Sequence, residues 1–94
     1  MSGQKEFLHE PDALRYVLRI DGDVVASVDY AQGAGTVSLV RTFTRPTHRG
    51  QGLAAQIVEF AVDDIAARGD RIVPMCWYVE QWFDEHPDRK DLLA

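Results

Sequence analysis

The chain has 94 residues, of which 46% are hydrophobic and 27% are charged, and its formal net charge is −5. This length suffices for one small domain and leaves no room for a separate catalytic domain, while the composition is typical of a folded, ordered protein. The acidic balance argues against sequence-independent binding of nucleic acid, which depends on clustered Lys and Arg.

A few residues bear on metal binding, membrane association and the cellular compartment. Cys76 is the only cysteine, so an intrachain disulfide is excluded and a cysteine-based zinc site is disfavoured. His9, His48 and His86 lie far apart and match no helical metal-ligand spacing. His48 is expected to be a solvated loop residue, with contact to a phosphate or substrate as the alternative. No run of about 18 apolar residues could span a membrane, and residues 1–6 lack the apolar core of a signal peptide. We expect no metal, no membrane association, and a reducing, cytoplasmic setting.

The first half of the chain predicts an antiparallel meander of strands. Turn signals separate the strand-forming runs, with Asp-Gly-Asp at 21–23 and a glycine-rich break at 32–35. The runs are, in chain order, residues 6–10, 14–20, 24–31 and 36–44. The last run alternates, which predicts that one face of the sheet carries the side chains of Val37, Leu39, Arg41 and Phe43.

The hydrophobic period changes after Pro46. Apolar side chains then recur every four residues from Leu53 to Ile65, so an amphipathic helix that ends at Gly69 is predicted. Residues 71–77 have the pattern of a short buried strand. Because it follows a helix that crosses back, it should lie parallel to the strand before that helix.

A second helix is predicted over residues 78–86, where aromatic side chains pair at helical spacing before Pro87 stops it. Within it, Tyr78 and Trp82 are expected to serve mainly in packing. The fold class is therefore α+β. An antiparallel meander is followed by a helix, a strand parallel to the preceding one, and a C-terminal helix, all in one domain over residues 1–94.

Residues 49–54, Arg-Gly-Gln-Gly-Leu-Ala, stand where the long helix should begin. A helix start exposes unpaired N–H groups and partial positive charge, which attract phosphate. Glycines at 50 and 52 permit a tight turn and a close approach to the backbone, and Arg49 adds a positive charge. The loop lacks the Lys-Ser/Thr of a Walker loop and does not follow the first strand of a dinucleotide-binding unit. It predicts a phosphate-bearing ligand, with a simple tight turn as the alternative.

The same loop fits the pattern Arg/Gln-x-x-Gly-x-Gly/Ala, with Arg49, Gly52 and Ala54 at its fixed positions. It resembles the pyrophosphate loop of the GNAT superfamily of acetyl-CoA-dependent N-acetyltransferases. Residues 39–87 as a whole are similar to a family of very small GNAT-like proteins that have little more than the acetyl-CoA-binding core. Residues 74–78 match that family's Pro-x-Cys-x-Tyr/Phe motif, and residues 86–87 match its His-Pro.

The resemblance implies a GNAT-like minimal acyl-CoA N-acyltransferase fold. The strands at 37–44 and 71–77 would splay apart, with the pantetheine arm of coenzyme A between them and the amides of residues 51–55 on the pyrophosphate. The implied cofactor-binding residues are Phe43, Thr44, Arg49, Gly50, Gln51, Gly52, Leu53, Ala54, Ala55, Cys76 and Tyr78. Cys76 would lie near the thioester as the catalytic candidate, either protonating the departing thiolate or carrying the acetyl group itself. A role in packing alone stays open.

One departure from the family concerns Arg41-Thr42, where many members have His-Thr. Arginine is a poor proton acceptor, so Arg41 could instead contact an acidic substrate or a phosphate of coenzyme A. The expected function is acetyl transfer from acetyl-CoA to an unknown amine, on a small molecule or a protein. The alternative is a non-catalytic module that binds CoA or acetyl-CoA and acts with a partner protein. A monomer or weak homodimer is expected.

Overall fold

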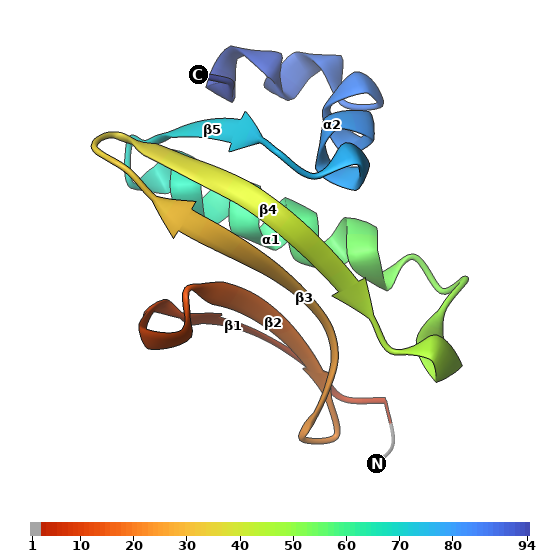
Figure 1. Ribbon diagram of the computed structural model, residues 1–94. Coiled ribbons are helices and arrows are strands. Elements are labelled where there is room, and N and C mark those ends of the chain that lie inside the picture. Colours follow the sequence, from red (N-terminus) through yellow and green to blue (C-terminus); the bar gives the residue numbers. More distant parts are fainter. Residues whose placement is uncertain (1–2) are drawn as a thin grey trace.

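The computed structural model describes residues 3–94, which form one five-stranded sheet and two α-helices. The elements are β1 (Lys5–Glu10), β2 (Arg15–Ile20), β3 (Asp23–Gln32), β4 (Thr36–Thr44), α1 (Leu53–Ala67), β5 (Arg71–Pro74) and α2 (Trp77–Asp84), with short 3-10 turns at Pro11–Ala13, Pro46–His48 and Pro87–Leu92. The strands follow one another in sequence order, antiparallel except for β5, which is parallel to β4. The predicted α+β order is confirmed (Figure 1).

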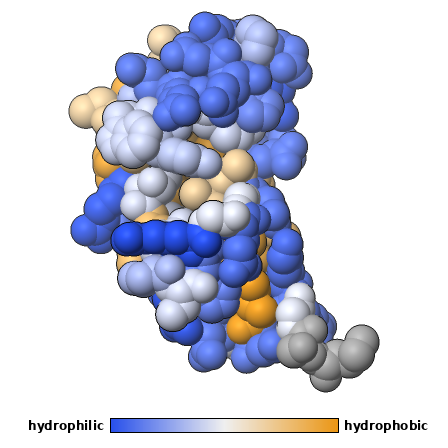
Figure 2. All heavy atoms as spheres, turned by 90° about the vertical axis from the view of Figure 1, so that its right-hand side faces the viewer, coloured by the Kyte–Doolittle hydropathy of each residue, from blue (hydrophilic) through white to orange (hydrophobic). Residues whose placement is uncertain are grey.

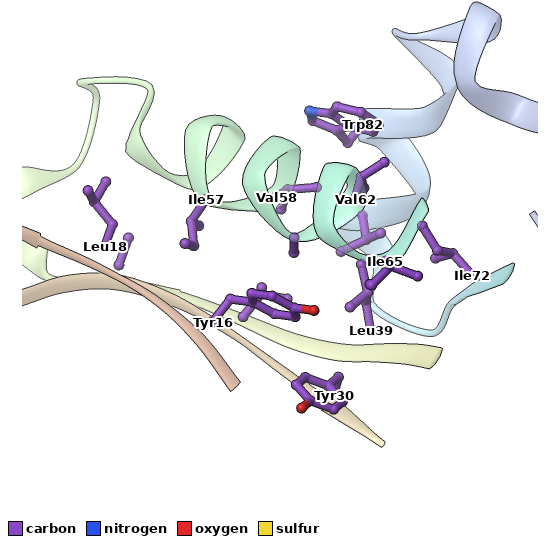
Figure 3. Packing of buried hydrophobic residues seen from close by; sticks show 14 of the residues in the cluster. Tyr16, Leu18, Tyr30, Leu39, Ile57, Val58, Val62, Ile65, Ile72 and Trp82 are labelled. Atoms are coloured by element: carbon purple, nitrogen blue, oxygen red, sulfur yellow. The ribbon is translucent and has the colours of Figure 1, made fainter. Parts of the chain in front are cut away.

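Helix α1 lies along one face of the sheet and supplies about a third of the buried core residues (Figure 3). The side chains with the predicted four-residue recurrence are buried against the strands, which excludes water from this face. Buried residues of α1 are Leu53, Ile57, Val58, Ala61, Val62 and Ile65. The helix ends at Ala67, and Gly69 adopts a φ of 81°, the left-handed conformation that favours glycine after a helix. Neither α1 nor α2, the two α-helices of residues 3–94, is long and apolar enough to span a membrane.

A polar network ties the first three strands to the second half of α1. The fully buried Tyr16 of β2 donates its hydroxyl hydrogen to Asp64 of α1 at 2.7 Å, and Arg68 donates to the same hydroxyl at 3.1 Å. His9 of β1 and the hydroxyl of Tyr30 of β3 form a hydrogen bond of 2.7 Å. Burial, followed by the adjacent Asp64 carboxylate, raises the pKa of Tyr16 above its ordinary value, so the phenol stays protonated as a donor.

Replacing Tyr16 with phenylalanine should lower the free energy of unfolding by about 1–2 kcal/mol, because the partly buried Asp64 loses its shortest hydrogen bond. Urea unfolding measures the change. Tyr78→Phe is the matched control, since the Tyr78 hydroxyl has no side-chain hydrogen bond within residues 3–94. Its expected change is below about 0.5 kcal/mol. Equal losses in the two variants would show that the network contributes nothing specific.

Strand β4 contains a β-bulge that turns its second half over. Val40 has no partner in β3, so the pairing shifts by one residue at that point. Val37 and Leu39 are buried on the α1 side, whereas Arg41 and Phe43 are exposed on the opposite face. The prediction that all four share one face was therefore wrong. Simple alternation assumes one residue for each residue of the neighbouring strand, and a bulge breaks that count.

The sequence predicted a strand over residues 71–77, but β5 ends at Pro74. Pro74 pairs with Leu39 in the last step of the parallel ladder, and proline has no N–H with which to continue it. The N–H groups of Met75 and Cys76 both donate to the carbonyl oxygen of Leu39, at 3.0 and 3.1 Å. The chain leaves the sheet there, and Trp77 begins α2.

The two parallel strands therefore form a fork. Beyond the last paired residue, Leu39, residues 40–44 of β4 have β3 on one side and no strand of the described chain on the other. The start of α1 lies beyond the end of β4, and α2 begins shortly after β5 (Figure 1). An open strand edge, a glycine loop and two helix starts thus meet at one end of the molecule.

Candidate functional site

A pocket of about 210 Å³ lies at this end, between the end of β4, the loop before α1 and the first turn of α2. It is lined by Thr44, His48, Arg49, Gly50, Gly52, Leu53, Ala54 and Tyr78. Figure 2 shows this side of the molecule, which is mostly hydrophilic and is interrupted by patches of intermediate and hydrophobic residues. The lining combines a positive charge, backbone amides and one phenol, a set suited to an anion carried on a partly apolar ligand.

The start of α1 is left uncapped by the described side chains. Gly52 is the N-cap, with a φ of 74°, and no side chain of residues 3–94 bonds to the first turn, which also has no acidic residue. The N–H groups of residues 53–55 therefore lack intrahelical acceptors and carry partial positive charge. A Cβ at Gly50 or Gly52 would meet nothing within 4 Å, so glycine is required there for its positive φ and not to avoid a clash within the chain.

Positive charge at the loop comes from Arg49 and Arg45. Arg49 is exposed and lines the pocket, and neither side chain forms an ion pair within residues 3–94. Arg41, by contrast, donates from Nε and Nη2 to one carboxylate oxygen of Asp29, at 3.1 and 2.9 Å, on the face opposite α1. This pairing makes Arg41 a poor candidate for binding a phosphate in the pocket.

Cys76 lies in the fork, where it is the N-cap of α2 and is partly buried. Its Sγ is 3.8 Å from the hydroxyl oxygen of Thr42, on the open half of β4. Burial raises the pKa of the thiol, but the N–H groups of Tyr78, Val79 and Thr42 and the hydroxyl of Thr42 outweigh it, so the pKa falls below the ordinary 9.0. The Sγ makes no capping bond of regular geometry to α2, so these donors act on the thiolate from nearby positions.

Alkylation by iodoacetamide should test the state of this thiol in the native protein. Because the pKa of Cys76 is lowered, the rate should reach half its maximum at a pH below 9.0. Thr42→Val removes the hydroxyl donor and should move that midpoint to higher pH, while Thr44→Val, two residues along β4, should not. Intact-protein mass spectrometry against pH measures both. A cysteine that reacts only after unfolding would be a packing residue.

The structure brings most of the predicted cofactor-binding residues to this pocket. Those that line it are Thr44, Arg49, Gly50, Gly52, Leu53, Ala54 and Tyr78. Phe43 does not, because the bulge turns it to the opposite face, and Ala55 packs against the core. The exposed Gln51 stands in the loop beside the pocket, and Cys76 lies further along the fork.

Two residues at the site lie outside the predicted set of site residues. His48 lines the pocket, whereas the sequence favoured a solvated loop residue over contact with a phosphate or substrate. Its place one residue before Arg49 was the available signal, and that place is equally typical of a solvent-exposed side chain. Thr42 contacts Cys76 across 34 residues of chain, a proximity that only the sheet register creates. His86 does not line the pocket; its Nδ1 donates to the carbonyl of Trp82 at 2.7 Å and its ring stacks on that indole.

Comparisons with known proteins agree with the fold. A family profile described as GCN5-related N-acetyl-transferase matches residues 15–92. The solution structure of a GCN5-like protein from Staphylococcus aureus superposes with a TM-score of 0.73 at 12% identity, over 95% of this chain and 87% of that one. The crystal structure of the ribosomal-protein-S18-alanine N-acetyltransferase from Escherichia coli gives a TM-score of 0.59 at 19% identity.

The coverage of the Escherichia coli enzyme is unequal, with 70% of this chain matched to 39% of that one. This chain therefore spans well under half the length of that enzyme. No curated protein matches the sequence. At these identities the two structural likenesses concern the fold alone.

Proposed function

This chain belongs to the GCN5-related N-acetyltransferase family, and we propose that it binds acetyl-CoA and transfers the acetyl group to an amine. The observation that carries the proposal is the fork itself. An unpaired strand edge at residues 40–44 runs toward an uncapped, glycine-led helix start, with a thiol of lowered pKa beside it. These are the groups that an extended ligand with a diphosphate and a thioester would use.

Binding of the diphosphate is assigned to the start of α1. The N–H groups of residues 53–55 would donate to phosphate oxygens, and Arg49 would add a charge-assisted hydrogen bond. Positive φ at Gly52 directs the backbone into this turn, and the missing Cβ leaves it accessible. The amide groups of the pantetheine arm would bond to the open edge of β4, as an added strand bonds to a sheet.

Cys76 is assigned the chemical step, and its lowered pKa favours attack over proton donation, because it increases the fraction of the nucleophilic thiolate. The thiolate would attack the thioester carbonyl carbon, forming a new carbon–sulfur bond and releasing the thiolate of coenzyme A. A neutral amine would then attack the cysteine thioester, lose a proton to solvent, and regenerate the Cys76 thiolate. A backbone N–H at the fork would stabilise the developing oxyanion.

A binding module without transferase activity is the second candidate. The observation that favours it is size, because this chain spans only 39% of the Escherichia coli enzyme with which it shares the fold. Within residues 3–94, few residues outside the fork are available to enclose an acceptor. In that case a partner protein would supply the amine.

Calorimetry with acetyl-CoA tests the shared premise, and mass spectrometry then separates the two candidates. We expect saturable binding, followed by acetyl transfer to Cys76 or to an added amine. Acetyl groups on neither the protein nor any amine, despite binding, would support the module. Absence of binding at millimolar acetyl-CoA would overturn both.

A further inference from the structure

Exposed hydrophobic side chains gather at the fork. Residues 3–94 expose five large hydrophobic side chains, and four of them are Val40 (42%), Phe43 (47%), Met75 (65%) and Trp77 (73%). We call these four the apolar rim. The fifth, Leu14 (46%), precedes β2, and its carbonyl accepts the N–H of Tyr30, so β3 separates it from the fork. Solitary exposed hydrophobic residues are ordinary, but a concentration beside a reactive group indicates a binding surface.

The connectivity places the residues of the apolar rim next to the segments that surround the Cys76 thiol, with Phe43 on the face of β4 opposite α1. Val40 follows Leu39, whose carbonyl accepts the N–H groups of Met75 and Cys76. Phe43 follows Thr42, whose hydroxyl oxygen is 3.8 Å from the Cys76 sulfur. Each rim residue is therefore within one residue of an atom that holds the fork together.

The rim is not used to pack α2. That helix buries Val79, Trp82 and Phe83, whereas Trp77, its first residue, leaves 73% of its surface exposed and meets Tyr78 edge to face with ring centroids 5.9 Å apart. An indole that contributes so little to folding is available to a ligand. Aromatic and thioether side chains form adaptable apolar contacts with such ligands.

Charges near the rim do not suit a polycation. The guanidinium of Arg41 already engages Asp29, the carboxylate of this part of β3 and β4. Glu80, exposed in the first turn of α2, is the one acidic residue there. A polyamine or a lysine-rich segment would bring several positive charges to a surface with one uncommitted carboxylate and the side chain of Arg41, so charge complementarity is poor.

We infer that the apolar rim receives the acceptor, and that the acceptor is a primary amine carried on an aromatic or aliphatic body with no second cationic group. The inference rests on the function proposed above and deepens it. Apolar surroundings disfavour the charged ammonium form, so they would increase the fraction of neutral, nucleophilic amine at the thioester. This accounts for a site to which the sequence assigns no dedicated base.

Calorimetric titration of the full chain, free and saturated with CoA, should compare 2-phenylethylamine with spermidine. We expect 2-phenylethylamine to bind more tightly to both forms. The double variant Met75→Gln/Trp77→Gln should weaken that binding by about tenfold or more, which corresponds to roughly 1.4 kcal/mol of lost apolar burial. Leu14→Gln is the control, since it removes an exposed hydrophobic side chain that lies outside the apolar rim, across β3 from the fork.

The outcomes separate this inference from the function on which it rests. Tighter binding of spermidine, or equal 2-phenylethylamine affinity in the double variant and the Leu14→Gln control, would overturn the inference while acetyl-CoA binding stands. A double variant that loses affinity for acetyl-CoA and keeps its affinity for 2-phenylethylamine would show that the apolar rim binds the cofactor. That result would also overturn the inference. Absence of acetyl-CoA binding by the unaltered chain would instead contradict the proposed function. The amine titration of the CoA-free chain would still show whether the apolar rim binds the amine.

Discussion

Replacing Gly52 with valine should weaken acetyl-CoA binding by about 10- to 100-fold, the loss expected for one or two charge-assisted hydrogen bonds. Gly52 is the N-cap of α1 and has a φ of 74°. A branched side chain disfavours that conformation and stands where phosphate should approach the first-turn amides. Isothermal titration with acetyl-CoA measures the affinity, and circular dichroism establishes that the variant is folded.

The matched control is Gly69→Val at the other end of α1. Gly69 has a φ of 81°, and a Cβ there also meets nothing within 4 Å, so the backbone strain is the same in kind. Both variants should lose about 1–2 kcal/mol of stability in urea. Only Gly52→Val should lose affinity. Equal affinity for acetyl-CoA in the two folded variants would show that the pyrophosphate does not bind at the start of α1.

Replacing Cys76 with alanine should lower acetyl transfer by about 100-fold or more, the usual scale for loss of a group that acts directly in proton transfer or nucleophilic attack. The affinity for acetyl-CoA should change less than about threefold, because the proposed grip uses backbone groups of α1 and β4. Turnover is followed as release of the thiol of coenzyme A in the presence of an amine. Oxidised coenzyme A should also form a mixed disulfide with the native protein and none with the variant.

Thr42→Val is the companion variant, because it keeps the thiol and removes one donor to it. The pKa of Cys76 should rise toward its ordinary value, so the alkaline rise in turnover should shift to higher pH with little loss at its maximum. Unchanged turnover in Cys76→Ala would show that the amine attacks the thioester directly. Loss of acetyl-CoA binding in a folded Cys76→Ala protein would show that Cys76 is needed for cofactor binding as well as for acetyl transfer.

Much of the fold follows from local chemistry that the sequence displays. The Asp-Gly-Asp turn between β2 and β3 adopts φ values of 52° at Asp21 and 88° at Gly22, as a tight hairpin turn requires. The four-residue recurrence from Leu53 to Ile65 became the buried face of α1. These features depend on residues close together in the chain, which is why a pattern could predict them.

The fork could not be predicted in detail because non-local geometry sets it. The bulge at Val40 follows from how β4 pairs with β3, and the alternating pattern of β4 gives no sign of an extra residue. The exit of the chain after Pro74 depends on the carbonyl of Leu39 accepting two N–H groups from a segment more than thirty residues away. Proline marked the position, but only the register showed which strand it would leave.

The candidate site likewise has a part that local sequence could predict and a part that depends on non-local pairing. Residues 49–54 are contiguous, so a motif could place them together, and most of them line the pocket. Thr42 and Cys76 meet only because the parallel register brings the end of β5 beside the second half of β4. The lowered pKa of the Cys76 thiol depends on that meeting, and the sequence could offer only the nearby helix start as a reason to expect it.

The open edge of β4 is also a hazard to the protein when no ligand covers it. Five residues, 40–44, present free strand edge over about 16 Å, and exposed hydrophobic side chains at Val40 and Phe43 adjoin it. Such an edge is a template for pairing with the same edge of another molecule, which leads to aggregation. Arg41 is the second residue of this edge, with 77% of its side chain exposed and its guanidinium paired with Asp29 of β3. Two copies that met edge to edge would bring a charged Arg41 side chain from each chain to the junction, and charged side chains on an edge strand disfavour such pairing.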